Sequence, residues 1–191
     1  MRYQPNHKLQ THQKIVKDAA RRVRAEGLTG AAVSAVMRDA GLTHGGFYKH
    51  FASKDELLNA SVSEAFREIA DRLALSAEHS RPGTAWKGIV KTYLSPEHCE
   101  HPEFGCPVAA LAPELARADA TTRARIPEEL MKYQKRMLPY MPGRTTADKK
   151  LNFIVILATM IGALSIARLL PDPAARAKVL ANARGFLLRS V

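Results

Sequence analysis

The stretch from Asp39 to Glu56 constrains the fold of this chain more than any other segment. It reads Asp-Ala-Gly-Leu-Thr-His-Gly-Gly-Phe-Tyr-Lys-His-Phe-Ala-Ser-Lys-Asp-Glu, which predicts a short helix that ends at Gly41, a second short helix that Thr43 is placed to cap, and a newly capped third helix. Glycine costs an isolated helix about 1 kcal/mol relative to alanine, so Gly45 and Gly46 within the second helix need a reason. One reason is the close approach of a large partner to the backbone.

The polar residues beside this glycine pair favour DNA as that partner. His44, Tyr48, Lys49 and His50 surround the pair. Such side chains contact phosphates and the edges of bases in the grooves of a duplex. We therefore interpret about residues 32–51 as a helix-turn-helix DNA-binding motif.

Helical periodicity runs through the rest of the chain, and no segment reads as a convincing β-strand. Ser53 and Glu56 form a capping box that starts a long helix, along which apolar residues recur to Leu73. The expected helices cover about 12–26, 34–40, 43–51, a long one that starts at 53, 85–94, 108–117, 120–140, 146–170 and 174–189, with a polar loop at 95–105. The predicted fold is all-α with about nine helices, divided into a DNA-binding domain at residues 8–68 and a larger domain at residues 69–191.

The composition is that of a soluble globular protein. Of 191 residues, 46% are hydrophobic and 25% are charged, which allows a sizeable core. Two cysteines do not make a disulfide framework, and Met1–Gln13 lacks the apolar run of a secretory signal, so we expect a cytoplasmic protein. The 17 uncharged residues of Leu151–Ala167 fall short of a spanning helix and predict a buried one, with no membrane partner.

Positive charge is concentrated in the first quarter of the chain. The net charge is +11, and residues 1–51 hold nine Lys or Arg against three Asp or Glu, together with four of the seven histidines. A basic segment of this kind suits double-stranded DNA, and its binding should weaken with salt. A solvated basic surface is the alternative explanation of the charge.

Four motifs follow one another in this region, namely Gly41-Leu42-Thr43, Gly46-Phe47-Tyr48, His50-Phe51 and Ser53-Lys54-Asp55-Glu56-Leu57. Together they make residues from about Thr11 to Leu73 similar to the DNA-binding domain of the tetracycline-repressor (TetR) family of transcriptional regulators. A further stretch, Gly105–Ala112, resembles a ligand-domain motif in one branch of that family.

The resemblance implies DNA contacts by ten residues. Phosphate binding would fall to Thr43, Tyr48, His50 and Lys54, major-groove contacts to His44, Gly45, Gly46 and Lys49, and contacts from the preceding helix to Ser34 and Arg38. Thr43 as a cap and Tyr48 as a packing residue are structural alternatives. Phe47 and Phe51 are expected in the core.

The resemblance also implies a dimer with a ligand pocket. The last two helices would pair with those of a second copy, through the candidate residues Leu157, Ile161, Leu164, Val179, Ala183 and Phe186, although burial within one subunit is the alternative. The middle helices would enclose an apolar effector, with the candidate lining residues Trp86, Tyr93, Cys106, Met131, Tyr133, Met137 and Phe153, which an ordinary core also uses.

The stretch Glu97–Pro107 contains both cysteines and allows three interpretations. A metal site could use His98, Cys99, His101 and Cys106, but no separated ligand pairs frame a fold, so no metal is expected. A thiol switch could use Cys106 at the N-cap of the next helix, where the helix dipole favours thiolate, with Cys99 as the resolving partner. The third interpretation is a small buried cysteine that begins a core helix.

These inferences predict a transcriptional regulator and not an enzyme, without a cofactor. The expected mechanism is a homodimeric repressor that a small apolar effector releases from a palindromic operator. The alternatives are release through oxidation of Cys106, a sequence-indifferent DNA-binding protein, and an enzyme that pairs Cys106 with His98 or His101.

Overall fold

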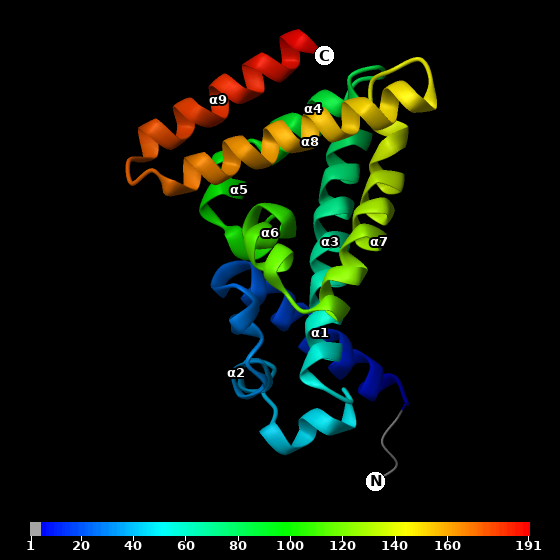
Figure 1. Cartoon of the computed structure of the whole chain (residues 1–191), viewed down its shortest axis with the longest axis vertical. Helices are drawn as coiled ribbons and strands as arrows, with labels where there is room; N and C mark the ends of the chain where they lie inside the picture. Colours follow the sequence, from blue (N-terminus) through cyan, green and yellow to red (C-terminus); the bar gives the residue numbers. More distant parts are fainter. Residues whose placement is uncertain (1–4) are drawn as a thin grey trace.

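Helices alone form the computed structural model, which describes residues 5–191 and has no β-strand within that range. The all-α class predicted from helical periodicity is therefore confirmed. Figure 1 shows an elongated molecule with a small helical head at one end and two long helices that lie across the other end.

The head comprises four elements and the start of a fifth. They are α1 (Pro5–Glu26), η1 (Leu28–Ala31), α2 (Val33–Asp39), η2 (His44–Lys49) and the first turns of α3 (Lys54–Glu78), where η denotes a 3-10 helix. Phe47 and Phe51 are buried and stack with ring centroids 5.5 Å apart, as the apolar spacing predicted. They pack with Ile15, Val36 and Met37 in a core that belongs to the head.

The turn between α2 and η2 depends on Gly41. Its φ of +76° lies in the left-handed region that side chains disfavour, so the predicted helix stop at this glycine is confirmed. The amide of Leu42 donates to the carbonyl of Met37 (2.8 Å), which satisfies a free carbonyl at the end of α2.

Two local predictions in the head need correction. The segment that begins at His44 is a 3-10 helix, which suits a six-residue piece with two glycines that disfavour an α-helix. Thr43 occupies its N-cap position without a side-chain capping bond. The second correction concerns the predicted capping box at Ser53 and Glu56. Ser53 does cap α3 by accepting from the amide of Glu56 (3.1 Å), but the Glu56 carboxylate accepts from the amide of Ala52 (2.6 Å), one residue before the amide that a capping box requires.

The larger body contains the remaining helices. They are α4 (Ala85–Tyr93), α5 (Pro96–Glu100), η3 (Pro102–Phe104), α6 (Pro107–Arg117), α7 (Ala120–Met137), η4 (Leu138–Tyr140), α8 (Thr146–Leu169) and α9 (Pro173–Ser190). In Figure 1, α3 and α7 run along the molecule, while α8 and α9 lie across the end opposite the head. Leu57 packs in the head core and Leu58 in the body core, so α3 is shared by both parts.

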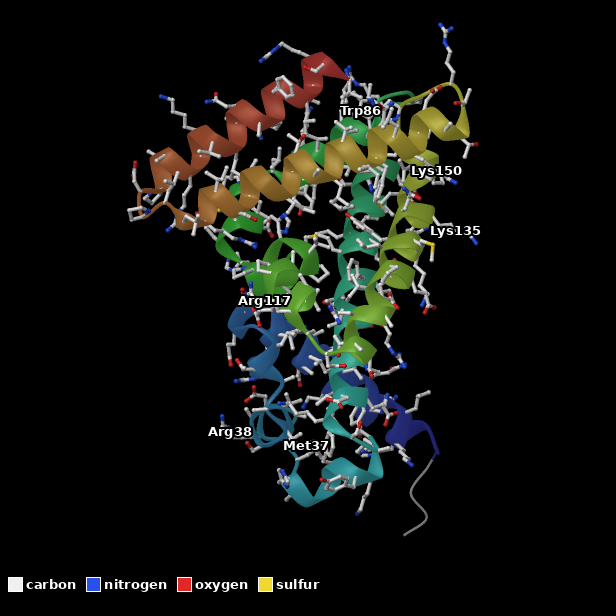
Figure 2. All side chains as sticks on the ribbon, viewed as in Figure 1. Met37, Arg38, Trp86, Arg117, Lys135 and Lys150 are labelled. Carbon is white, nitrogen blue, oxygen red and sulfur yellow. The ribbon has the colours of Figure 1, made fainter. Side chains whose placement is uncertain are left out.

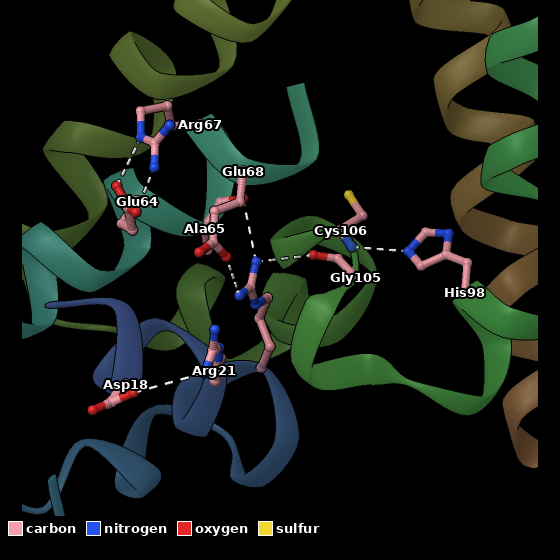
Figure 3. Close-up of polar contacts among 10 residues, drawn as sticks. Asp18, Arg21, Glu64, Ala65, Arg67, Glu68, His98, Gly105 and Cys106 are labelled. Carbon is pink, nitrogen blue, oxygen red and sulfur yellow. Dashed lines mark hydrogen bonds and ion pairs between the residues drawn. The ribbon is translucent and has the colours of Figure 1, made fainter. Parts of the chain in front are cut away.

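The segment 95–105, expected as a polar loop, contains α5 and η3 instead. Ser95 caps α5 by accepting from the amide of His98 (3.2 Å), and Pro96 occupies the first helical position. This turn buries His98, which connects two other elements. Its Nδ1–H donates to the carbonyl of Tyr93 (2.7 Å) and its Nε2 accepts from the amide of Cys106 (3.0 Å), as Figure 3 shows for the second bond.

We predict that His98 makes stability depend on pH. Burial lowers the pKa of His98 from 6.5 to about 4, so the unfolded chain binds a proton before the folded one does as the pH falls. The neutral His98 therefore stabilises the folded state fully above pH 6.5. As the pH falls towards about 4, the free energy of unfolding decreases by about 3 kcal/mol. His98→Gln can donate and accept through its amide but cannot titrate, so chemical denaturation should give it a shallower decline over this range. Replacing the exposed His79 by Gln should leave the wild-type slope, and equal slopes for all three proteins would contradict the assignment.

Candidate DNA-binding site

The predicted DNA-contacting residues lie in α2, in η2 and its flanking residues, and in the first residue of α3. Most of these ten residues are exposed, while Gly46 and His50 are half-buried. Figure 1 shows the elements that carry them at the end of the molecule opposite α8 and α9. The structure therefore brings the predicted set to one end of the head, on a small and rigid scaffold.

Arg38 and Tyr48 are two strongly exposed large side chains of this set. The Arg38 side chain is 77% exposed and points outward from α2 in Figure 2. Its neighbour Asp39 is held mainly by Arg22 (2.8 Å), so Arg38 makes only a 4.0 Å contact with this carboxylate. Tyr48 is 72% exposed and rests one edge against Phe47. Both side chains are free to reach a partner.

No contact among the described residues requires glycine at position 45. A Cβ atom added there would meet nothing within 4 Å, and one at Gly46 would make an ordinary contact with Met37 at 3.6 Å. Neither residue has the positive φ that favours glycine. No contact within the described residues thus explains the glycine pair, and an open backbone of this kind suits a surface that a duplex approaches closely.

His50 differs electrostatically from the lysines around it. Burial lowers the pKa of His50, and the neighbouring His12, Lys8 and Lys49 lower it further. Its Nδ1 is buried without a hydrogen-bond partner, and the His12 ring stacks on Phe51 at 4.6 Å. At neutral pH, His50 is thus a neutral hydrogen-bonding group, not a phosphate-binding charge.

A buried arginine joins the head to the body, and sequence reasoning missed it. The Arg24 guanidinium, on α1, donates to Glu68 on α3 (2.5 Å) and to the carbonyls of Ala65 (3.5 Å) and Gly105 (3.4 Å), as Figure 3 shows. Its side chain is fully buried, and burial lowers the pKa of Arg24. The only signal in the sequence was an arginine directly beside the apolar stripe of α1.

Helix α6, which begins two residues after Gly105, also contacts the head near its C-terminal end. The Glu114 carboxylate accepts from the amide of Leu28 (2.8 Å), at the start of η1. A side chain at Gly27, where φ is +78°, would collide with this carboxylate at 2.7 Å. The segment from Gly105 to Glu114, which includes most of α6, therefore contacts the head at both of its ends.

The predicted effector residues are gathered in the body core with one exception. Trp86, Tyr93, Cys106, Tyr133, Met137 and Phe153 are all buried. The Tyr133 and Phe153 rings meet edge to face at 5.6 Å. Met131 is 63% exposed, so its prediction as a lining residue is wrong. It lies two residues before Tyr133, which places it on the outer face of α7.

The predicted dimerisation residues divide between the core and the surface. Leu157 and Leu164 are buried within the subunit, Ile161, Val179 and Ala183 are half-buried against the core, and Phe186 is 57% exposed. For Leu157 and Leu164 the prediction of an interface is therefore wrong, because periodicity cannot decide which side of a helix that is apolar all round faces its own core. The exposed face of α8 is formed instead by Leu151, Ile154, Val155, Ile166 and Leu169.

The cysteine region supports the third of its three interpretations. Cys106 does occupy the N-cap of α6, but it is completely buried, and burial raises the pKa of the Cys106 thiol. Desolvation therefore outweighs the helix dipole, and the structure gives no support for the activated thiolate that a thiol switch requires. Both ring nitrogens of His98 bind backbone groups, so His98 can act neither as a metal ligand nor as a base for the thiol.

A helix-turn-helix head with an exposed basic and glycine-containing end defines a DNA-binding protein. Residues 15–61 match the model of the bacterial regulatory proteins of the tetR family. Residues 15–61 thus form a DNA-binding domain of the TetR type, which indicates a role in DNA binding and transcriptional regulation.

Solved structures share the fold over nearly the whole chain. A TetR transcriptional regulator from Chloroflexus aurantiacus is 22% identical, with a TM-score of 0.74, and covers 96% of this chain and 97% of its own. A TetR-family regulator from Cytophaga hutchinsonii is 18% identical, with a TM-score of 0.73 and 95% of each chain covered. The fatty acid degradation regulator FadR from Bacillus halodurans is 15% identical, with a TM-score of 0.67 over 95% of this chain and 96% of its own. No curated protein sequence matches the chain significantly.

We predict that Gly45→Ala keeps the fold and weakens DNA binding. The added methyl group meets no atom of residues 5–191 within 4 Å, so the melting temperature should stay the same or rise. Affinity for an operator duplex should fall about tenfold or more, which corresponds to about 1.4 kcal/mol. Gly41→Ala is the contrast, because its left-handed φ should make the substitution cost about 1–2 kcal/mol of stability. Unchanged DNA affinity in Gly45→Ala would mean that no duplex approaches this backbone.

Removal of the Arg24 guanidinium should destabilise the whole molecule. Arg24→Met leaves Glu68 without its buried partner, and we expect a loss of about 3 kcal/mol in urea unfolding at pH 7. The exposed Arg123, on α7, provides the control, since Arg123→Met should change stability by less than about 0.5 kcal/mol. A loss for Arg24→Met as small as that of the control would show that the bridge contributes nothing.

Proposed function

We propose that this TetR-family regulator is a homodimeric repressor, which a small-molecule effector releases from a palindromic operator. The observation that carries the proposal is an apolar surface on α8 that its own subunit leaves uncovered.

The exposed apolar residues of α8 recur at helical spacing. Leu151, Ile154, Val155, Ile166 and Leu169 are each between 46% and 82% exposed, and Phe186 on α9 adds a further 57% exposed ring. Soluble monomers seldom expose apolar surface of this extent, so it indicates an interface. A second copy of the chain is the occupant we propose, because α8 and α9 together offer a self-complementary pair of helices.

The same helix meets the length and composition of a membrane span. Among residues 5–191, α8 alone does so, and 33% of its most apolar stretch is buried. Its earlier prediction as a buried helix therefore holds for one side only. We assign the exposed side to dimerisation, and we place the protein in the cytoplasm with its DNA.

A dimer would present two heads to one duplex. A single helix-turn-helix reads few base pairs, and a twofold dimer reads two half-sites separated by about one helical turn or a multiple of it. We propose that His44, Gly45, Gly46 and Lys49 face the major groove. The remaining predicted residues, Ser34, Arg38, Thr43, Tyr48, His50 and Lys54, would bind the phosphate backbone on either side.

Release would follow from a ligand in the body core. An effector that prefers the conformation with misplaced heads shifts the population away from the DNA-bound state. The two contacts of α6 with the head, through Gly105 to Arg24 and through Glu114 to Leu28, provide a path for that shift. The alternatives have less support: a neutral buried Cys106 disfavours both a thiol switch and a Cys106-based enzyme.

We predict that Ile166→Glu produces a monomer. A carboxylate in the proposed apolar interface would have to be buried without a partner, so sedimentation should show half the mass of the wild-type particle. Leu75→Glu is the matched control, because Leu75 is similarly exposed (56%) but lies on α3. A wild-type protein that sediments as a monomer, or an Ile166→Glu variant that remains a dimer, would contradict the proposed interface.

Selection from random DNA tests the operator and separates a repressor from a sequence-indifferent binder. Wild-type protein should enrich a palindrome, and Ile166→Glu should bind the enriched duplex at least 100-fold more weakly at equal salt. Failure to enrich any palindrome would favour the sequence-indifferent alternative.

A further inference from the structure

The hydroxyl group of Tyr93 is a buried polar atom without a hydrogen bond. Tyr93 is the last residue of α4, its side chain is fully buried, and its hydroxyl makes no hydrogen bond of good geometry among the described residues. The neighbouring Cys106 thiol interacts with it but offers only sulfur, which is a weak acceptor. An unsatisfied buried hydroxyl costs about 1–3 kcal/mol. A cost of this size in the middle of a core needs an explanation, and a ligand that supplies the missing partner is one.

The polar groups around this hydroxyl are hydrogen-bond donors that stay neutral. Burial raises the pKa of Tyr93, and the neighbouring Cys106 and Tyr133 raise it further. Burial likewise raises the pKa values of Cys106 and Tyr133. None of these groups ionises near neutral pH, so each can donate its proton to an acceptor. The cluster therefore contains several donors but no strong acceptor, because the Cys106 sulfur accepts hydrogen bonds only weakly.

One cation lies close to the cluster without a carboxylate partner. Arg168, on α8, donates to the carbonyls of Cys99 (3.2 Å) and His98 (2.7 Å), and no ion pair between described residues includes it. Its charge favours the ionised forms of Tyr93 and Cys106, which shows that the guanidinium is near enough to act on them. The guanidinium therefore lies close enough to the cluster to favour an acceptor that is electron-rich or negatively charged.

A surface groove shares one residue, Tyr133, with the cluster. The groove between α3 and α7 has a volume of about 380 Å³, within the usual range for small-molecule sites. The Phe66, Ala70 and Tyr133 side chains line it, with charged residues of both signs around them. Tyr133 belongs to both places, since its side chain lines the groove while its ionisable group lies near Cys106.

We propose that the body core binds a small apolar compound that carries a carbonyl oxygen, either a ketone or a carboxylate, and that this oxygen accepts a hydrogen bond from Tyr93. The apolar part of the compound would lie against Phe66, Tyr133 and Phe153. This inference rests on the proposed function, because it names the chemical class of the effector. It assigns to Tyr93 the role of a specificity-determining residue.

Three probes of similar size and different oxygen content test the proposal by calorimetry on the protein without DNA. They are acetophenone, which has a ketone, benzoate, which has a carboxylate, and ethylbenzene, which has no oxygen. At least one oxygenated probe should bind the wild-type chain about fivefold to tenfold more tightly than ethylbenzene, as expected for one buried hydrogen bond. Preference for benzoate would implicate Arg168, and preference for acetophenone would indicate a neutral site.

Tyr93→Phe removes only the oxygen that the proposal requires. Because that hydroxyl is unsatisfied, the variant should keep or increase its melting temperature, which separates a binding effect from misfolding. It should lose the advantage of the oxygenated probe while binding ethylbenzene normally. Tyr140→Phe is the matched control, since the Tyr140 hydroxyl donates to Glu78 (2.7 Å) away from the cluster. Equal loss in both variants, no loss in Tyr93→Phe, or no preference for an oxygenated probe would overturn the proposal.

A separate experiment measures how the bound probe changes the affinity for operator DNA. Binding that depends on Tyr93 and also weakens the operator complex supports both the ligand class and effector-driven release. Binding that depends on Tyr93 without any change in DNA affinity supports the ligand class and contradicts release by this ligand in the proposed function.

Discussion

The buried guanidinium of Arg24 is the interaction on which the arrangement of the two parts depends. A buried charge costs several kcal/mol unless it is paired, and Arg24 finds its three partners in two segments: Glu68 and Ala65 on α3, and Gly105 just before α6. These partners fix the angle of α1 against the body. A shift of α1 against the body would therefore have to rearrange this network.

The start of α6 connects this network to the polar cluster in the body core. Gly105 accepts from Arg24, and the next residue, Cys106, donates its amide to His98 and places its thiol near Tyr93. Head and body core thus meet across two consecutive residues. A ligand that displaced the side chains around Tyr93 would act directly on the backbone that Arg24 holds, without the need for a long chain of intermediate contacts.

Local chemistry made several elements of this structure predictable. Gly41 ends α2 because its φ is left-handed, Ser53 starts α3 because its hydroxyl accepts an orphan amide, and Phe47 and Phe51 share a face because they are four residues apart. The exposure of Tyr48 and Lys49 followed from the same spacing. Each of these inferences needed only neighbours within about one helical turn.

The sequence by itself determined the all-helical class, the helix-turn-helix head and the type of residue at its surface, because turns, caps and helical periodicity are short-range properties. Tertiary structure alone decided which side of α8 is buried, why Met131 is outside the core, and that the Cys106 thiol is neutral. It also decided that Arg24 meets Gly105, 81 residues away in the chain. These outcomes depend on desolvation and on contacts between distant segments, and no local pattern of residues specifies which segments will meet.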